Sequence, residues 1–170
     1  MTVTRARRSN QSCASMVEFA ISGPVLLLST ISVLQLCLAM WNYESLAFAV
    51  REGARYASTK GQGCSYGTNS CSTTVGNVTN QILNNAVGLI PADLNVTLGA
   101  TSSVSITCSP ITNCTKNGSA WPPSTGNTEG VSVLTVSATY PFSLFFMPQQ
   151  GVLGVSSGNL QASSQQVVQF

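Results

Sequence analysis

The fold of this chain is decided by the stretch FAISGPVLLLSTISVLQLCLAM, which runs from Phe19 to Met40. These 22 residues include no charged side chain. A helix of about 20 apolar residues is long enough to cross the hydrocarbon core of a bilayer, which is about 30 Å thick. Trp41 and Tyr43 follow directly, where aromatic rings favour the headgroup level. The stretch therefore predicts one transmembrane helix.

Two other interpretations of the apolar run are open. A buried core helix would need more surrounding chain than this sequence provides. A cleaved secretory signal usually has an apolar region of about 7–15 residues, which is shorter than this one, although Ala47-Phe48-Ala49 has the A-x-A form of a cleavage site. We favour the membrane helix over both.

The residues before the apolar run are basic. Arg5, Arg7 and Arg8 lie there with no acidic residue among them, and a short positively charged tail stays on the cytoplasmic side of a membrane. The chain as a whole has 7% charged residues and a net charge of +2, which does not indicate nucleic-acid binding. We expect a single-pass protein of the inner (plasma) membrane, with a cytoplasmic N-terminus and a periplasmic or extracellular C-terminal domain.

The helical pattern continues beyond the membrane. Apolar residues recur at spacings of three and four as far as Ala57, and Gly61-Gln62-Gly63 then ends the pattern. We expect a helix from about Met16 to Ser58, with a length on the order of 60 Å at about 1.5 Å per residue. Pro24 removes a backbone hydrogen bond inside this helix, so we predict a kink there.

The rest of the chain carries patterns of a small α+β domain. Apolar residues between Thr73 and Gly88 recur at helical spacing, and we expect a helix that Ser72 starts and Gly88 stops. Alternating apolar residues predict four strands, around 94–98, 104–106, 131–140 and 160–168. A phase slip between Val133 and Leu134 suggests a bulge or a strand buried on both faces.

These patterns together predict an α+β chain. A long N-terminal transmembrane helix continues outside the membrane and is followed by a small domain with one helix and an antiparallel sheet. The expected divisions are a basic cytoplasmic tail at 1–15, the transmembrane and extended helix at 16–60, and an extracytoplasmic α+β domain at 61–170. The apolar stretch 141–148 is too short to span a bilayer, and we favour core or membrane-surface contact over partner binding for it.

Four of the six cysteines lie in the expected outer domain, where thiols oxidise. Of the three pairings that four cysteines allow, we favour two local disulfides, Cys64–Cys71 and Cys108–Cys114. The rival is a zinc site made of all four cysteines, although zinc sites usually place two to four residues between the members of each pair. Cys13 and Cys37 lie before or within the apolar run and should stay unpaired.

The sequence offers little for catalysis. It has no histidine, which removes the commonest general base and metal ligand. The charged residues beyond Lys60 are Asp93, Lys116 and Glu129. An enzyme would need a Ser or Thr nucleophile with Lys116 as base, or a pair of carboxylates that nothing in the sequence brings together. We therefore predict a non-enzymatic protein without a cofactor or a metal site.

Three short segments of the chain form a recognisable pattern: 16–20 (MVEFA), 24–28 (PVLLL) and 51–55 (REGAR). Together they resemble the TadE-like pseudopilins, minor pilins of the tight-adherence (Flp-type) pilus system. In that family a basic tail and a cleavage site precede Val-Glu-Phe-Ala, an apolar helix with an early proline follows, and Arg-Glu-Gly-Ala-Arg ends the pattern. The resemblance covers about residues 11–58.

The resemblance implies roles for residues at the inner end of the helix. In pilin-like proteins a prepilin peptidase cuts the tail so that a glutamate becomes the fifth residue of the mature chain. Glu18 would take that place if the cut follows Cys13 and Ala14 becomes the first residue. The family usually has glycine before the cut, so Cys13 is a departure. The new amino group could then pair with Glu18 of a neighbouring subunit, which relieves two costly charges in the membrane.

The resemblance therefore implies a structural component in the assembly of a tight-adherence pilus. Its expected partners are the membrane, other pilins or pseudopilins, prepilin peptidase and the pilus assembly machinery, with no nucleic acid. The alternative is a membrane-anchored binding or cell-adhesion module that is not processed. The state of the mature N-terminus discriminates between them, because a plain anchor has no reason to be cut.

Overall fold

The structure is a computed structural model that describes residues 7–60, 65–66, 69–100, 104–122, 133–142 and 158–168. Within the first range it places side chains from Ser15 onward. The chain divides into two compact units, Met1–Leu38 and Ala39–Phe170. The predicted cleavage residues Cys13 and Ala14 lie in helical backbone. Cys64, Glu129 and most of the apolar stretch 141–148 lie outside the described residues.

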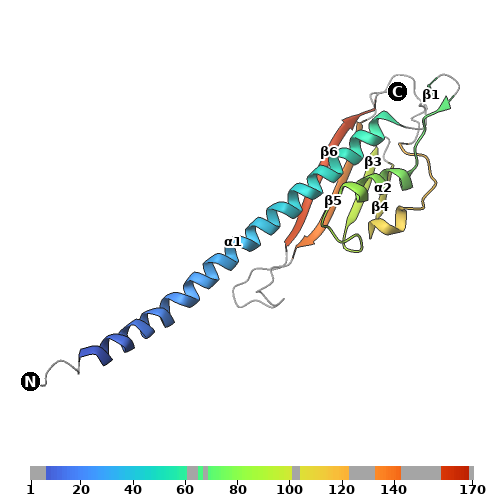
Figure 1. The fold of residues 1–170 in the computed structure, drawn as a ribbon. Coiled ribbons are helices and arrows are strands. Elements are labelled where there is room, and N and C mark those ends of the chain that lie inside the picture. Colours follow the sequence, from blue (N-terminus) through green and yellow to red (C-terminus); the bar gives the residue numbers. More distant parts are fainter. Residues whose placement is uncertain are drawn as a thin grey trace, which may run out of the picture. The chain divides into compact units, whose positions relative to one another are not determined.

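The first element is α1, Arg7–Thr59, an α-helix of 53 residues (Figure 1). It begins nine residues before the expected start at Met16, because no proline or glycine interrupts the chain between Arg7 and Ser15. Its end at Thr59 lies one residue beyond the expected Ser58. Pro24 lies inside α1, and the helix continues on both sides of it.

The second unit is built on a four-stranded antiparallel sheet. Its strands are β3 (Asn95–Ala100), β4 (Ser105–Cys108), β5 (Val133–Phe142) and β6 (Gly158–Val167), in the spatial order β4-β3-β5-β6. The pairing of β5 with β6 runs without interruption from Val133↔Val167 to Phe142↔Gly158. The bulge suggested by the phase slip is therefore absent from β5. Val133 lies on the less buried face of the sheet, where it pairs with Val167 of β6. An apolar residue on that face explains the slip in the apolar pattern.

The two faces of the sheet differ in composition. The residues on one face, which include Val96, Leu98 and Leu134, are buried. On the other face the register aligns Thr97, Ser137 and Ser163 in a row, among other serines, threonines, asparagines and glutamines. This alternation of buried and half-exposed residues along β3 and β5 is the period-two pattern of a sheet that is covered on one side only.

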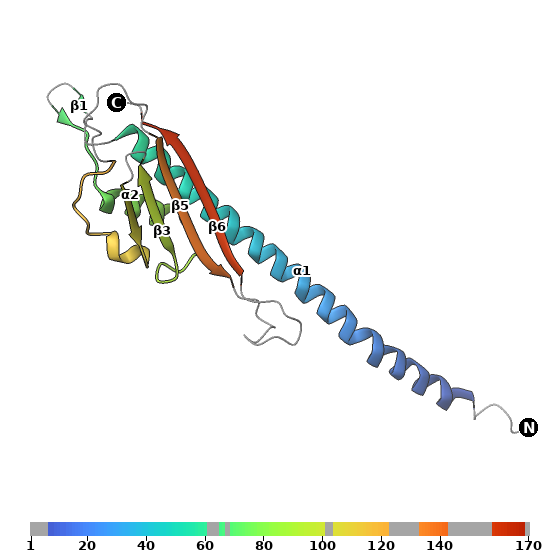
Figure 2. The same ribbon diagram turned by 180° about the vertical axis from the view of Figure 1, so that it is seen from behind.

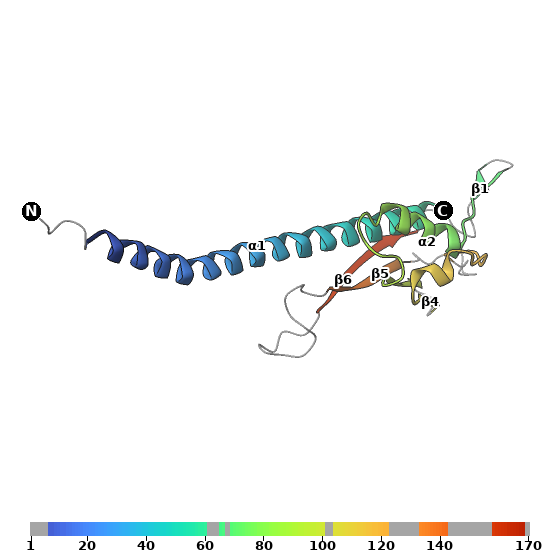
Figure 3. The same ribbon diagram turned by 60° about the horizontal axis from the view of Figure 1, so that its bottom comes forward.

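The covered face packs against two helices. The part of α1 from Ala39 onward lies on it beside α2, Val75–Asn85, and both helices lie on the same side of the sheet (Figures 1 and 3). Seen from behind, the strands stand in front of α1 (Figure 2). The buried residues of α1 recur at spacings of three and four, which is how a helix presents one stripe to a core. They are Leu46, Ala49, Val50, Gly53, Ala54, Ala57 and Ser58.

Helix α2 is shorter than the expected 73–88 helix. Thr74, not Ser72, is its N-cap, and the Thr74 hydroxyl accepts a hydrogen bond from the backbone N–H of Asn77 at 3.3 Å. The N–H groups of Val75 and Gly76 donate to the carbonyls of Ser119 and Asn117, both at 2.9 Å. These bonds satisfy donors that the first turn of a helix leaves unpaired.

The remaining described elements are short. Two-residue strands β1 (Ser65–Tyr66) and β2 (Asn69–Ser70) pair antiparallel, and η1 (Ile111–Cys114) is a 3-10 turn. Trp121 is fully buried in the core. The long N-terminal helix, one further α-helix and a four-stranded antiparallel sheet confirm the predicted α+β fold.

Candidate functional site

The part of α1 between Ser15 and Leu38 leaves its apolar side chains uncovered. Its most apolar window is not buried by any other part of the described chain, and the helix is long and apolar enough to cross a membrane. The apolar side chains point outward around the helix, so no single face is reserved for the chain's own core. The large exposed ones are Met16, Val17, Phe19, Ile21, Val25, Leu26, Leu27, Leu28, Val33, Leu34, Leu36 and Leu38.

Most hydroxyl groups in this segment are satisfied by their own helix. Ser22 Oγ donates to the carbonyl of Glu18 at 2.8 Å, and Ser29 and Ser32 make equivalent bonds within the preceding turn, also at 2.8 Å. Such bonds lower the cost of placing a hydroxyl in hydrocarbon. The serines are therefore compatible with insertion of this helix into a bilayer.

Gln35 differs from these serines. Its amide nitrogen Nε2 is buried against the helix and has no hydrogen-bond partner among the described residues. An amide in this segment needs a partner, and in membranes polar side chains such as glutamine form hydrogen bonds to neighbouring helices. The sequence prediction did not single out Gln35, although a lone amide inside an uncharged apolar run was the available signal.

Glu18 lies near the N-terminal end of the segment. It is the only charged residue between Ser15 and Tyr43, and its side chain is exposed. Within the described side chains its carboxylate has no ion-pair partner. A carboxylate at this level is costly unless it reaches the interface or finds a positive partner.

The Arg-Glu-Gly-Ala-Arg segment lies in the second unit, where α1 meets α2. Gly53 and Ala54 are buried, while Arg51 and Arg55 are exposed. A β-carbon on Gly53 would lie against Ile82 of α2, 2.9 Å from its Cδ1 atom and closer still to Cγ1. The small residues of the motif thus allow the two helices to approach, and the arginines stay in solvent.

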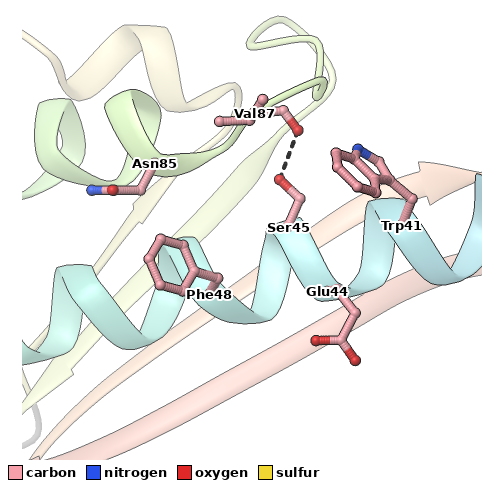
Figure 4. Close-up of a pocket in the computed structure, with 6 residues that line it drawn as sticks. All are labelled: Trp41, Glu44, Ser45, Phe48, Asn85 and Val87. Carbon is pink, nitrogen blue, oxygen red and sulfur yellow. Dashed lines mark hydrogen bonds between the residues drawn. The ribbon is translucent and has the colours of Figure 1, made fainter.

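An open groove lies between α1 and the end of α2 (Figure 4). Its volume is about 390 Å³. The Ser45 hydroxyl donates to the backbone carbonyl of Val87 at 2.7 Å and so joins the loop after α2 to α1. Trp41 and Phe48 lie on α1 on either side of this bond. The lining residues are Trp41, Glu44, Ser45, Phe48, Asn85 and Val87.

Cysteine pairing follows the spacing in the part of the chain that can be described. Cys108 at the end of β4 is joined to Cys114 at the end of η1, with a Cα–Cα distance of 5.7 Å. Cys71 is also disulfide-bonded, and its predicted partner Cys64 lies outside the described residues. Cys37 is a free thiol. Because Cys108 and Cys114 are oxidised, a zinc site built from all four cysteines does not form.

The candidate catalytic residues that the structure describes form no constellation. Asp93 and Lys116 are both exposed. Among the described residues there is no group of three or more histidine, cysteine, aspartate or glutamate side chains that could hold a metal ion. The features with the clearest chemistry therefore lie along α1.

The fold and these surfaces define a class: a chain with one long exposed apolar helix, long enough to span a membrane, that carries a small disulfide-containing α+β domain beyond it. Residues 14–55 match the model of a family described as TadE-like protein. This confirms the predicted resemblance over that segment, which is less than half of the chain. No curated protein and no solved structure matches the chain.

The family match indicates a pilin-like protein associated with a tight-adherence pilus. Such proteins are structural components and are not known as enzymes. The matched segment holds Glu18, Pro24 and the Arg-Glu-Gly-Ala-Arg motif. It ends at Arg55, so the match carries no information about the sheet or the disulfide.

Proposed function

We propose that this chain is a minor pilin or pseudopilin, a non-catalytic subunit that takes part in the assembly of a tight-adherence (Flp-type) pilus. The observation that carries the proposal is the family match at residues 14–55, which includes the exposed apolar part of α1. A chain that leaves so much apolar surface uncovered needs lipid or other helices around it. A pilin subunit uses both, first in the membrane and then in a filament.

The proposed topology follows from charge. The basic residues before Ser15 hold the N-terminus in the cytoplasm. The apolar part of α1 crosses the inner membrane once. The domain with the sheet then lies in the periplasm or outside the cell, a compartment that agrees with the disulfide between Cys108 and Cys114.

The proposed processing step is cleavage between Cys13 and Ala14 by prepilin peptidase. Support comes from the distance to Glu18, which would become the fifth residue, and from the family match, which begins at Ala14. Cleavage creates an amino group close to the inner edge of the apolar run. The Glu18 carboxylate of a neighbouring subunit would pair with this amino group and set the register between helices.

Mass spectrometry of the mature N-terminus tests the proposal. We expect a chain that starts at Ala14 when prepilin peptidase is present and an uncut chain when it is absent. A chain that keeps its tail in the presence of the peptidase would instead favour the unprocessed binding or adhesion module. A start just past Ala49 would show a secreted protein and would remove the anchor altogether.

A further inference from the structure

The most exposed large apolar side chains of the second unit lie on two neighbouring segments. Among its described residues, those with more than half of their surface exposed are Met40, Trp41, Phe48, Val87 and Ile90. All of them belong to the turns of α1 around residues 40–48 or to the loop that follows α2. The other exposed large apolar residues of this unit are less exposed: Tyr43 at 46%, Val104 at 41% and Val167 at 47%. A cluster of this kind on one surface indicates an interaction site.

Two of these residues, Trp41 and Val87, lie at one level along α1, and Ile90 follows in the same loop as Val87. A β-carbon on Gly88 would lie 3.5 Å from Nε1 of Trp41, and the Ser45 hydroxyl holds the Val87 carbonyl at 2.7 Å. Figure 4 shows the Trp41 indole and Val87 on the same side of α1. We call Trp41, Val87 and Ile90 the basal apolar surface. They are 64%, 64% and 56% exposed.

The conformation of the loop after α2 is fixed by a glycine and by hydrogen bonds. Gly88 has a φ of +83°, which only glycine adopts without strain. The backbone N–H of Leu89 donates to Ala86 at 3.3 Å, and that of Ile90 donates to the Tyr140 hydroxyl at 3.4 Å. Leu89 is buried beneath the loop. The loop therefore turns Val87 and Ile90 outward while its backbone stays bonded to the domain.

The level of the basal apolar surface along α1 suggests what covers it. Trp41 follows the uncharged run directly, and a tryptophan in that place favours the headgroup region of a bilayer. The first charged residue of the second unit along the chain is Glu44, three residues after Trp41, and it lines the same groove. A surface at the level of Trp41 therefore meets the acyl and headgroup boundary before it meets water.

We propose that the basal apolar surface is a lipid-contact surface, which inserts the loop after α2 into the outer interface of the same membrane that α1 crosses. This proposal rests on the membrane anchoring proposed above. The three residues of this surface are a tryptophan and two aliphatic side chains, which suit an interfacial contact, while the exposed carboxylates of Glu44 and Asp93 lie outside it. The function of the surface is to hold the second unit against the membrane before assembly.

Tryptophan quenching by brominated lipid tests this with the full-length chain in phosphatidylcholine vesicles. The chain has two tryptophans, Trp41 and Trp121, and Trp121 is buried in the core and supplies a constant background. In the wild type, quenching of Trp41 emission shows that α1 is inserted in the bilayer. In a W41F background, quenching of Ile90→Trp shows that the loop after α2 contacts lipid. Asn77→Trp in the same background is the control, because Asn77 is exposed at the far end of α2, about 12 Å from Asn85 at 1.5 Å per residue.

We expect bromination of the lipid to lower the emission of Ile90→Trp by a fraction similar to the loss at Trp41, with no loss for Asn77→Trp. Both introduced rings are the same, so the preference of tryptophan for interfaces does not explain a difference between them. Quenching of Trp41 without quenching of Ile90→Trp would overturn the lipid contact and leave the anchor intact. Equal quenching at Ile90 and Asn77 would also overturn it. Absence of quenching at Trp41 itself would overturn the anchor as well.

Discussion

Gly53 of α1 lies in direct contact with Ile82 of α2, so closely that a β-carbon on Gly53 would fall 2.9 Å from Cδ1 of Ile82. Both residues are fully enclosed between the two helices and the sheet. The glycine in the middle of a helix is unfavourable by itself, because glycine costs about 1 kcal/mol relative to alanine. The contact explains why glycine stands there: it sets the distance between α1 and α2.

Gly53→Ala should therefore destabilise the second unit. Overpacking of a core costs about 1–3 kcal/mol, which outweighs a gain of up to about 1 kcal/mol in helix propensity. We expect a net loss of about 1 kcal/mol in the free energy of unfolding, measured by urea denaturation of the full chain in detergent. Gly118→Ala is the control, because a β-carbon there meets no atom within 4 Å.

The contact makes a sharper prediction in a double variant. Ile82→Ala removes both atoms that crowd position 53, so in that background Gly53→Ala should raise the stability through helix propensity, by about 0.5–1 kcal/mol. The sign of the effect thus reverses between the two backgrounds. The same sign in both backgrounds would show that Ile82 is not what excludes a side chain at Gly53.

The disulfide between Cys108 and Cys114 should stabilise the same unit. It closes a short loop, for which chain entropy predicts about 2–3 kcal/mol, and both cysteines are buried in the core. The variant C108A/C114A should lose stability by that order of magnitude. We would measure it by urea denaturation without reductant, because a reductant would also open the disulfide of Cys71. An unchanged urea midpoint would show that this disulfide does not contribute to the free energy of unfolding.

Much of the fold could be predicted because local patterns determine it. The uncharged run from Phe19 to Met40 and the regular spacing as far as Ala57 predict α1, and the alternation around Val96 and Leu98 predicts β3. The short spacing of Cys108 and Cys114 indicates their pairing. Each of these signals is contained within a few turns or a single strand, so one sequence is sufficient to reveal it.

The rest depends on contacts between distant residues. The order β4-β3-β5-β6 places β5 beside β3 and not beside β4, and periodicity carries no information about such neighbours. Val133 disturbed the apparent alternation of its strand because it pairs with Val167 on the polar face. The bond from Ser45 to Val87 joins residues 42 positions apart. Such pairs become visible only when the chain is folded.

The bond from Ser45 to Val87 should determine how firmly the loop after α2 is held. Ser45→Ala removes the only side-chain donor that the structure gives the Val87 carbonyl, at a cost of about 1 kcal/mol. We expect faster hydrogen exchange at Leu89 and Ile90, with unchanged exchange in β5. Ser45→Thr keeps the hydroxyl and should behave as the wild type. Unchanged exchange in Ser45→Ala would show that the other contacts of the loop suffice.

Gln35 gives a prediction for helix association. Because its Nε2 atom lacks a partner among the described residues, we expect it to donate to a neighbouring helix in the membrane. Such bonds contribute about 0.6 kcal/mol on average, so Gln35→Leu should weaken self-association of the full chain about threefold in fluorescence energy transfer between labelled chains in vesicles. Ser32→Ala is the control, because the Ser32 hydroxyl bonds its own helix. Equal effects of both changes would contradict a role for Gln35.

Glu18 gives the prediction closest to the proposed function. Glu18→Gln keeps the size of the side chain and removes its charge, so insertion of α1 should be unchanged or easier. Pairing with the amino group of a cleaved neighbour would lose its charge attraction, and we expect a marked loss of incorporation into pili, measured by immunoblot of sheared filaments and of membranes. The variant should accumulate in the membrane with a mature N-terminus.

Glu44→Gln is the matched control for this experiment. Glu44 is also an exposed glutamate of α1, but it lies beyond the outer end of the apolar run, where no new amino group is expected. We expect normal incorporation of this variant, because the predicted pairing depends on the position of the carboxylate and not on the total charge of the helix. Normal pilus incorporation of Glu18→Gln would count against the pairing. A loss that both variants share equally would point to a general effect of charge and would also contradict a specific role for Glu18.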